Sequence, residues 1–349
     1  MPEAGRPRSG VRGRLLAAGG VLGAGVVLGC AVPASAEDVA AAPATQCQIT
    51  DPRLAEISGL VAVGDGYLAM NDGGEQLAVH MLDAACQVID SHTAAVDPYD
   101  PEDMAVAADG SVWLADTGDN NTTRTTVALL ALRPDGTTGV FRLTYPDGPH
   151  DAEALLLAPD GTPYVVTKEV LGASGVYSTP ASALVDGGTV ALAKVAGVNM
   201  TLTGTAGGPV GRAGQLLVTG GAVSADGRRL ALRTYTDAYV WPLTGSDVVG
   251  ALSAEPAIIP LPDSPQGEAI TFAADGQSLL VASEGLPSDL TRVPLAPAIV
   301  EATQPAPDGV VPSFSDLTRS GLSPWTSALI AASVATVAVW LGGKLRRRP

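Results

Sequence analysis

The feature that most constrains this chain is an Asp-Gly pair that recurs five times with an apolar run on each side. The pairs begin at Asp65, Asp109, Asp160, Asp226 and Asp275, at intervals of 44, 51, 66 and 49 residues. An Asp-Gly pair between two apolar runs is typical of a β-hairpin turn. The intervals are close to the roughly 40 to 50 residues of a four-stranded propeller blade. The sequence therefore predicts an all-β fold, a β-propeller of five four-stranded blades.

Two alternatives stay open for this repeat. The third interval is the longest, and its residues 199–214 leave room for a degenerate sixth blade. An irregular β-sandwich would use similar turns, but a period of about 50 residues with a fixed internal register favours the propeller. Paired outer strands are expected at Val127–Leu132 and Val140–Tyr145 in the second repeat. In the first repeat they are expected at Leu77–Leu82 and Cys86–Asp90.

Each repeat has a variable position seven residues before its Asp-Gly aspartate. The five residues at this position, called here the column, are Ser58, Glu102, Glu153, Thr219 and Glu268. Further carboxylates follow the second strand of several hairpins, namely Asp116, Asp119, Glu169 and Glu284. Because hairpin ends on one face of a propeller converge on its axis, we expect these carboxylates to approach one another.

Clustered carboxylates need a compensating cation or basic partner to stay ionised. Oxygen ligands of this kind suit Ca²⁺, Mg²⁺ or Mn²⁺, so the column predicts a divalent-cation site at the mouth of the channel. The alternative is structural, because acidic side chains beside turns often accept backbone N–H groups. Lys168 and Arg233 occupy equivalent positions after their strands and offer pairing without an ion.

His150 is the histidine next to the column, two residues before Ala152 in the segment PHDAE. It is a candidate general base or metal ligand, with a plain surface residue as the alternative. His80 and His92 fall in outer-strand regions and receive no role. The chain has no Gly-x-Ser-x-Gly, phosphate-loop or His-Glu-x-x-His motif. Sequence motifs thus give no support to nucleophilic catalysis or nucleotide binding.

Cys47 lies just before the first repeat, and Cys86 lies within it. In an exported chain, such a pair of cysteines predicts a disulfide. Residues 46–49 precede the first repeat, so they are expected to close the ring beside the outer strand that carries Cys86. In the chain-entropy model, such a loop contributes about 3–4 kcal/mol to stability.

The N-terminal region indicates export. Residues 1–36 combine a basic start, an apolar run and an Ala-Ser-Ala motif, which together predict a secretory signal peptide. An alternative interpretation makes Cys30 the lipidated residue of a lipoprotein signal. Residues 37–295 then form the predicted propeller ectodomain.

The C-terminal region indicates an anchor. Residues 296–323 are rich in Pro and Ser and predict an extended linker. Residues 324–343 are apolar and the tail 344–349 is basic, which predicts one transmembrane helix with a cytoplasmic tail. A buried core helix is the alternative. The expected location is the cell membrane, as a single-pass type I protein with the ectodomain outside.

Charge supports this division of the chain. Four of the 20 basic residues lie in the predicted signal and four in the tail, which leaves 12 against 35 acidic residues between them. An ectodomain with a net charge of −23 repels nucleic acid and anionic surfaces, so no nucleic-acid partner is expected.

Three segments carry a resemblance to a known group: DPEDMAVAADGSVWLADTGDN, HDAEALLLAPDGTPYVVTKE and PQGEAITFAADGQSLLVASEG. They resemble blades of secreted actinobacterial propellers, which are similar to phytase-esterase-like and gluconolactonase-type propellers. The resemblance spans residues 56–295 and implies an axial acidic site, often metal-loaded, with ester, lactone or phosphoester hydrolysis in some relatives. The chain departs from the phytase motif, whose nearest counterpart is Asp100-Pro101-Glu102-Asp103. Only the acidic column is therefore carried over.

The expected function is that of a membrane-tethered binding or interaction module for an unidentified protein or small molecule, with an acidic channel mouth for a divalent cation. The alternative is a metal-dependent secreted hydrolase of phosphoesters, esters or lactones. A passive envelope component is a third hypothesis, which only the finding of no ligand at all would distinguish.

Overall fold

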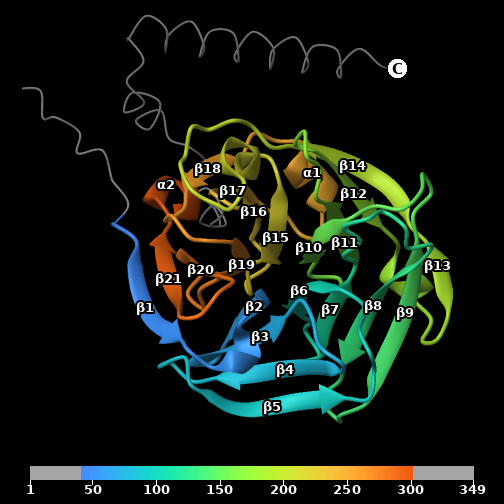
Figure 1. The fold of residues 1–349 in the computed structure, drawn as a ribbon. Helices are drawn as coiled ribbons and strands as arrows, with labels where there is room; N and C mark the ends of the chain where they lie inside the picture. The colour runs from blue at the N-terminus through green and yellow to red at the C-terminus, as the bar shows by residue number, and fades with distance from the viewer. Residues whose placement is uncertain (1–40, 302–349) are drawn as a thin grey trace, which may run out of the picture. The chain divides into compact units, whose positions relative to one another are not determined.

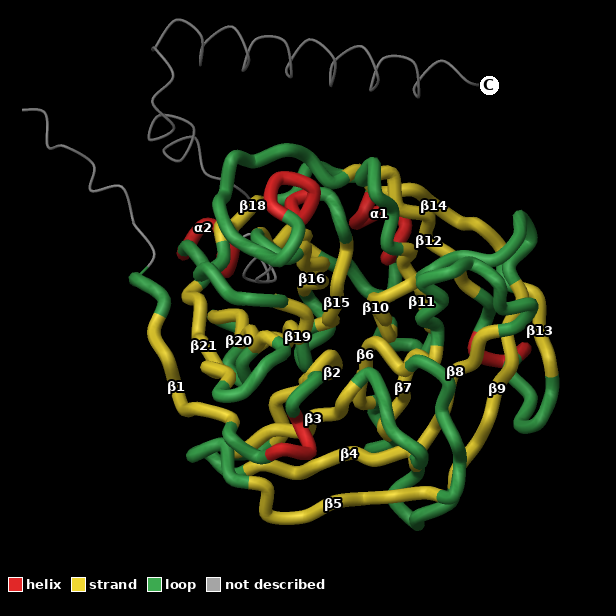
Figure 2. Tube along the Cα trace, viewed as in Figure 1, coloured by secondary structure: helices red, strands yellow, loops and turns green. Residues whose placement is uncertain are grey.

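The computed structural model describes residues 41–301 of the chain. Within this range, five sheets stand around a common axis as the blades of a propeller (Figures 1 and 2). The five-bladed, all-β architecture predicted from the repeat is confirmed. Residues 1–40 and 302–349 lie outside the described residues, and with them the predicted signal peptide, most of the linker and the transmembrane segment. Between residues 41 and 301, no helix is both long and apolar enough to cross a membrane.

Each blade runs outward from the axis, with its first strand innermost. Blade 1 contains β2 (Ile57–Val63), β3 (Gly66–Asn71), β4 (Leu77–Leu82) and β5 (Val88–Ala94). Blade 2 contains β6 (Pro101–Val106), β7 (Val112–Asp116), β8 (Val127–Leu132) and β9 (Thr138–Thr144), with β13 (Thr189–Ala191) added in parallel to β9. Blade 3 contains β10 (Ala152–Leu157), β11 (Pro163–Thr167), β12 (Ala173–Ser178) and β14 (Ala193–Asn199). Blade 4 contains β15 (Val218–Val223), β16 (Arg229–Thr234), β17 (Asp237–Pro242) and β18 (Ala257–Pro260). Blade 5 contains β19 (Gly267–Phe272), β20 (Ser278–Ser283), β21 (Ser288–Pro294) and β1 (Ala44–Ile49).

Short helices occupy the connections between strands. The 3-10 helices are η1 (Pro52–Leu54), η2 (Ala181–Ala183) and η3 (Gly211–Gln215), and the α-helices are α1 (Val248–Leu252) and α2 (Pro297–Glu301). Helix α2 occupies the first residues of the predicted linker. Its Ile299 and Val300 pack against the apolar cluster between blades 4 and 5.

The Asp-Gly turns form as the sequence predicts, with one difference in register. In blade 2, Val106 pairs with Val112, and Gly110 adopts a φ of 85° in the turn between them. A left-handed φ of this kind favours glycine because it has no Cβ. In blade 1, Val63 pairs directly with Gly66, so the left-handed residue is Gly64.

The apolar core is divided into five clusters, one between each pair of neighbouring blades. Leu, Val and Ala make up most of their buried residues. No blade buries both its faces alone, so the ring must close for the core to be complete.

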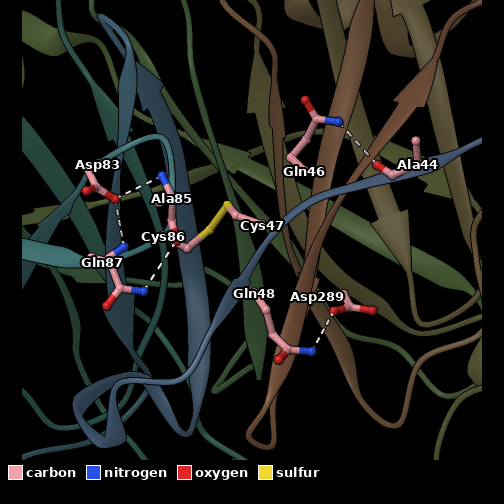
Figure 3. Close-up of a disulfide and its surroundings, with 9 residues drawn as sticks. All are labelled: Ala44, Gln46, Cys47, Gln48, Asp83, Ala85, Cys86, Gln87 and Asp289. Atoms are coloured by element: carbon pink, nitrogen blue, oxygen red, sulfur yellow. Dashed lines mark hydrogen bonds between the residues drawn. A yellow bond between two sulfur atoms is a disulfide. The ribbon is translucent and has the colours of Figure 1, made fainter.

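Ring closure differs from the sequence prediction. Strand β1 pairs antiparallel with β21 in blade 5, and not with the strand beside Cys86. Cys86 itself lies in the turn between β4 and β5 of blade 1. The predicted disulfide does form between Cys47 and Cys86, with 5.7 Å between the Cα atoms (Figure 3). It therefore fastens the closing strand of the last blade to the first blade.

The sixth blade that the long third interval left open is absent from the described residues. Part of the long third interval forms β13, which joins blade 2, and residues 200–217 form a loop with η3. The buried Asp237 carboxylate fixes this loop, since it accepts hydrogen bonds from Thr203 Oγ1 at 2.8 Å and Thr205 Oγ1 at 2.6 Å. Extra length in this repeat thus encodes an ordered loop.

Candidate functional site

Every column residue lies at an irregularity of its inner strand. The strand pairing shifts between Ile57 and Gly59, Pro101 and Asp103, Ala152 and Ala154, Val218 and Gly220, and Gly267 and Ile270. Each shift spans a column residue. A β-bulge leaves a residue out of the ladder and re-aims its side chain, which commonly occurs next to functional sites. The repeated bulge is the local reason why the column side chains leave the regular alternation of the sheet.

The two hydroxyl members of the column join neighbouring blades. Ser58 Oγ donates a hydrogen bond to the Glu102 carbonyl of blade 2. Thr219 Oγ1 donates to the Gly267 carbonyl of blade 5 at 3.0 Å. Both residues are buried. They therefore stabilise the ring, and the glutamates are the members left for chemistry.

The three glutamates are buried with exposed fractions of 3–4%, and two of them meet at one point. One carboxylate oxygen from each of Glu102, Asp151 and Glu153 lies within 4.8 Å of the others. Glu102 comes from β6, Glu153 from β10, and Asp151 from the residue just before β10. These three residues are called the acidic triad below.

Gly118 leaves room for the triad. A Cβ at this position would overlap Glu102 Oε1 and Asp100 Oδ2. The residue follows β7, where the chain leaves blade 2. A side chain here would collide with the carboxylates of Glu102 and Asp100, so glycine keeps the space beside them free.

Burial is the largest cause that raises the pKa of all three triad carboxyls, and nearby negative charges add to it. Burial is the largest cause that raises the pKa of Glu102, followed by the charges of Glu153 and Asp100. Burial also raises the pKa of Glu153 and of Asp151, although Lys168 lowers both. A bound cation removes this penalty because it favours the ionised carboxylates.

Three further carboxylates surround the triad and Glu268. Burial raises the pKa of Asp100 to about 6, with the charge of Asp151 adding to the effect. Burial and Glu56 raise the pKa of Asp72 to about 7. Burial and a hydrogen bond with Glu268 raise the pKa of Glu284 to about 9. The whole face is thus acidic beyond the triad.

Lys168 provides part of the compensating charge. Its Nζ forms an ion pair with Glu153 Oε1 and lies 5.2 Å from the centre of the Tyr235 ring. Burial opposes its charge, but Glu153 more than offsets burial and raises the pKa of Lys168. The second oxygen, Glu153 Oε2, is buried and has no hydrogen-bond partner among the described residues. A buried carboxylate oxygen without a partner is costly, and here it belongs to the triad.

Arg233 has a structural role instead. Its Nη1 donates to the Ala269 carbonyl at 2.6 Å and the Ala282 carbonyl at 3.0 Å. Burial lowers its pKa to about 10, although Glu268 opposes the effect. The guanidinium thus fixes blade 5 to blade 4 through backbone carbonyls.

The other predicted ligands lie outside the triad. Asp116 accepts hydrogen bonds from the backbone N–H of Asp100 at 2.9 Å and from Arg124 at 2.9 Å. Asp119 accepts from the backbone N–H of Thr123 and Arg124, at 2.9 and 2.7 Å. These two aspartates match the structural alternative of turn caps.

Glu268, Glu284 and Glu169 take separate partners. Glu268 accepts from Gln266 Nε2 at 3.2 Å and from Tyr235 OH at 3.5 Å. Its neighbour Glu284 shares a hydrogen bond with it. Glu169 accepts from Thr167 Oγ1 at 3.2 Å and is one-third exposed or more. The structure brings Glu268 and Glu284 together beside the triad, while Glu169 points to another group.

That group contains His150. Its Nε2 lies 3.0 Å from Asp147 Oδ1 and 2.9 Å from Tyr177 OH, and its Nδ1 lies 3.6 Å from Glu169 Oε1. Both ring nitrogens are thus oriented by neighbours that are not members of the triad. The geometry gives no direct support to His150 as a metal ligand.

Sequence reasoning missed Asp151 and Asp100, and a signal for both exists. Each lies two residues before a column glutamate, in Asp100-Pro-Glu102 and Asp151-Ala-Glu153, and Gln266 holds the same place before Glu268. The pattern therefore places an oxygen donor two residues before each of the three column glutamates.

No protein-family model and no curated protein matches the chain. Among solved structures, it is similar to a gluconolactonase from Xanthomonas campestris, at 19% identity over 66% of this chain and 68% of that chain, with a TM-score of 0.39. It is also similar to a glucose dehydrogenase, at 12% identity over 73% of this chain and 100% of that chain, with a TM-score of 0.40. A streptogramin B lyase gives 10% identity over 68% and 78%, with a TM-score of 0.38.

Gluconolactonase-type propellers are thus among the structural neighbours, as the sequence resemblance implied. At these identities and TM-scores, the likeness carries no argument about activity or ligand.

Proposed function

We propose that this chain is an extracytoplasmic propeller that binds one divalent cation, Ca²⁺ or Mg²⁺, at the acidic mouth of its channel. Glu102, Asp151 and Glu153 would hold the ion, because all their donors are carboxylate oxygens that hard cations prefer. The observation that carries the proposal is Glu153 Oε2, a buried oxygen of a triad residue that has no hydrogen-bond partner among the described residues. A cation at the triad would give this oxygen a positively charged partner. It would also compensate the repulsion between the triad carboxylates.

The decisive experiment is elemental analysis of the purified protein, paired with thermal melts with and without a chelator. We expect one equivalent of a divalent ion, a lower melting temperature in chelator, and loss of both effects in Glu153→Gln. Glu169→Gln is the matched control, since Glu169 lies on the same face outside the triad. No bound ion and an unchanged melt would make the triad structural.

Hydrolysis of an ester, lactone or phosphoester is the second candidate function. It is favoured by the position of protonatable groups beside the triad, since Asp72 and Glu284 have pKa values of about 7 and 9. Groups with such pKa values can exchange protons near neutral pH. A bound cation would supply Lewis-acid polarisation of the substrate oxygen or of water. Turnover of model esters, lactones or phosphoesters that disappears in Glu102→Gln would support this function.

We further propose that residues 1–36 export the chain and that residues 324–343 anchor it. The Cys47–Cys86 disulfide supports an oxidising location. If the cell surface is correct, external protease will digest the propeller region of intact cells, and the protein will stay with the membrane fraction in high salt. Recovery in the soluble cytoplasm would contradict both proposals. We also expect the tethered module to bind a partner, either a protein or a small molecule.

A further inference from the structure

A polar pocket, separate from the acidic triad, lies at the outer part of blade 1. It has a volume of about 640 Å³, within the range of small-molecule sites. Arg53, His80 and Ser91 line it, together with the connection from β3 to β4. No member of the acidic triad contributes to its lining.

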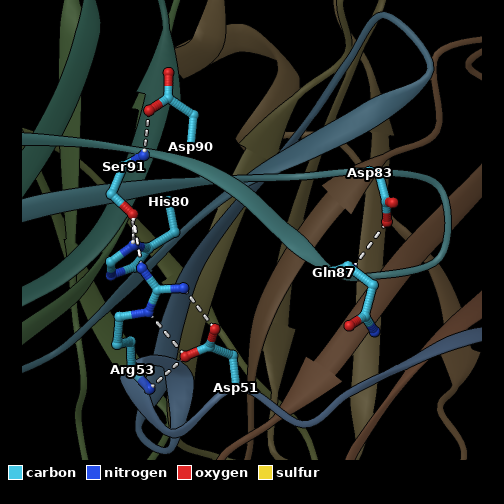
Figure 4. A network of polar contacts seen from close by, with 7 residues as sticks. All are labelled: Asp51, Arg53, His80, Asp83, Gln87, Asp90 and Ser91. Carbon is cyan, nitrogen blue, oxygen red and sulfur yellow. Dashed lines mark hydrogen bonds and ion pairs between the residues drawn. The ribbon is translucent and has the colours of Figure 1, made fainter.

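Ser91 lies between two nitrogen groups in this pocket. His80 and Ser91 are directly opposite each other on β4 and β5, and His80 Nδ1 lies 2.8 Å from Ser91 Oγ. Arg53 Nη1 donates to the same Ser91 Oγ at 3.0 Å (Figure 4). Because a guanidinium can only donate, the serine hydroxyl proton is free to point at His80 Nδ1. The network is therefore consistent with a serine that donates to a neutral imidazole.

The surroundings favour the basic form of His80. The residue is 6% exposed, and burial and then the charge of Arg53 lower its pKa. Asp51 holds Arg53 in place through two hydrogen bonds, Nε to Oδ1 at 2.9 Å and Nη2 to Oδ2 at 2.6 Å (Figure 4). The arginine is thus a fixed positive group against the serine oxygen. A fixed cation favours the developing alkoxide, and a neutral imidazole can take its proton.

The wall of the pocket offers unused backbone donors. The N–H groups of the segment 73–76, Gly-Gly-Glu-Gln, donate to no residue in the described part of the chain. All four of these residues line the pocket. Backbone N–H groups are the usual donors that stabilise the oxyanion of an acyl-transfer reaction. The pocket thus brings together the Ser91 hydroxyl, the His80 imidazole and a wall segment whose backbone N–H groups have no partner in the described part of the chain.

We propose that Ser91 is a nucleophile that accepts the acyl group of a small ester, with His80 as its general base and Arg53 as the group that stabilises the serine oxygen. Ser91 Oγ forms a bond to the ester carbonyl carbon while the bond from that carbon to the alkoxy oxygen breaks. His80 Nδ1 takes the hydroxyl proton and returns it to the leaving alkoxide, which departs as the alcohol. Water then hydrolyses the acyl-serine, which releases the carboxylic acid and restores Ser91.

The test is covalent labelling of the full chain with a fluorophosphonate probe, in chelator, followed by peptide mass spectrometry. We expect one phosphonyl group on Ser91 of the wild-type protein. Chelator does not change this result, so the test is independent of the cation proposed for the triad. Site mapping on the wild type also does not depend on how a variant folds.

Variants then separate the nucleophile from its base. Ser91→Ala abolishes labelling, and His80→Gln slows it about a hundredfold or more, because general bases contribute about 10²–10⁴ to such rates. His92→Gln is the matched control, since His92 neighbours Ser91 on β5, but its side chain is 53% exposed and its ion-pair partner within the described part of the chain is Asp90. Absence of label on wild-type Ser91, or equal rates in His80→Gln and His92→Gln, would overturn the proposal.

Discussion

At the scale of single residues, Asp103 joins three blades through one buried carboxylate. Its Oδ2 accepts the backbone N–H of Leu155 in blade 3 at 2.8 Å and of Gly221 in blade 4 at 3.0 Å. Its Oδ1 accepts the N–H of Met104 in its own blade at 2.8 Å. No sequence pattern predicts this role for Asp103, because its partners are 52 and 118 residues away. Such a contact has no local sequence signal.

Replacement of Asp103 by Leu tests this junction. The change leaves two inter-blade N–H groups buried without an acceptor, and each such group costs about 1–3 kcal/mol. We therefore expect the free energy of unfolding to fall by about 3 kcal/mol, as measured by urea denaturation. Asp103→Asn keeps one acceptor oxygen, so we expect a smaller fall in the free energy of unfolding. Asp289→Asn, at an exposed site, serves as the control, and an equal loss there would refute the role of Asp103.

Lys168 sets the charge of the acidic triad, so its removal changes cation affinity. Its ammonium is paired with Glu153 and therefore repels a cation that approaches the triad. Lys168→Met removes this repulsion and leaves all the triad carboxylates in place. We expect the dissociation constant for Ca²⁺ or Mg²⁺ to fall about tenfold, which corresponds to about 1.4 kcal/mol. Isothermal titration calorimetry measures the change, with Lys194→Met, an exposed lysine near Asp147, as the control. Weaker binding in Lys168→Met would show instead that the lysine positions Glu153.

At the scale of elements, the inner hairpin was the predictable unit. Its turn, its two strands and the column position have a local and repeated sequence pattern, and all five copies form. The bulge at each column residue was not predicted, because the spacing to the turn does not show the pairing register. Pairing of β1 with β21 was beyond prediction, because nothing near residue 44 specifies a partner about 245 residues away.

The closing strand makes the disulfide a test of ring closure. Cys47 and Cys86 are 39 positions apart in the sequence, and their bond ties β1 to blade 1. Replacement of both by Ser should lower the free energy of unfolding by about 3–4 kcal/mol in the chain-entropy model. Urea denaturation of the oxidised protein and the double variant gives the difference. If the two proteins unfold at the same urea concentration, strand pairing alone holds the ring closed.

At the scale of the whole molecule, the propeller collects carboxylates on one face without enough basic residues to pair them. The chain has 36 acidic and 20 basic residues, and eight of the basic residues belong to its two ends. Sequence alone predicted this imbalance and the convergence of the column. It could not predict which carboxylates meet, because that depends on bulges and loop ends that place Asp151 in the triad and turn Asp116 and Asp119 into caps.

This excess charge makes the stability of the cation-free protein depend on pH. The folded-state pKa values of Asp72 and Glu284, about 7 and about 9, lie above their ordinary values of 3.8 and 4.5. The folded state therefore binds these protons more tightly than the unfolded state. The stability they contribute is present below about pH 4 and is lost as the pH rises through about 7 and about 9.

We expect the melting temperature in chelator to fall steadily between pH 5 and pH 9.5. In Ca²⁺ the decline is smaller, because the ion compensates the carboxylates as they lose their protons. Glu284→Gln removes one titrating group, so its decline in chelator is shallower at the upper end of this range, while Glu75→Gln, an exposed control, follows the wild type. A melting temperature that rises with pH in chelator would mean that these carboxylates are already ionised and paired in the folded protein.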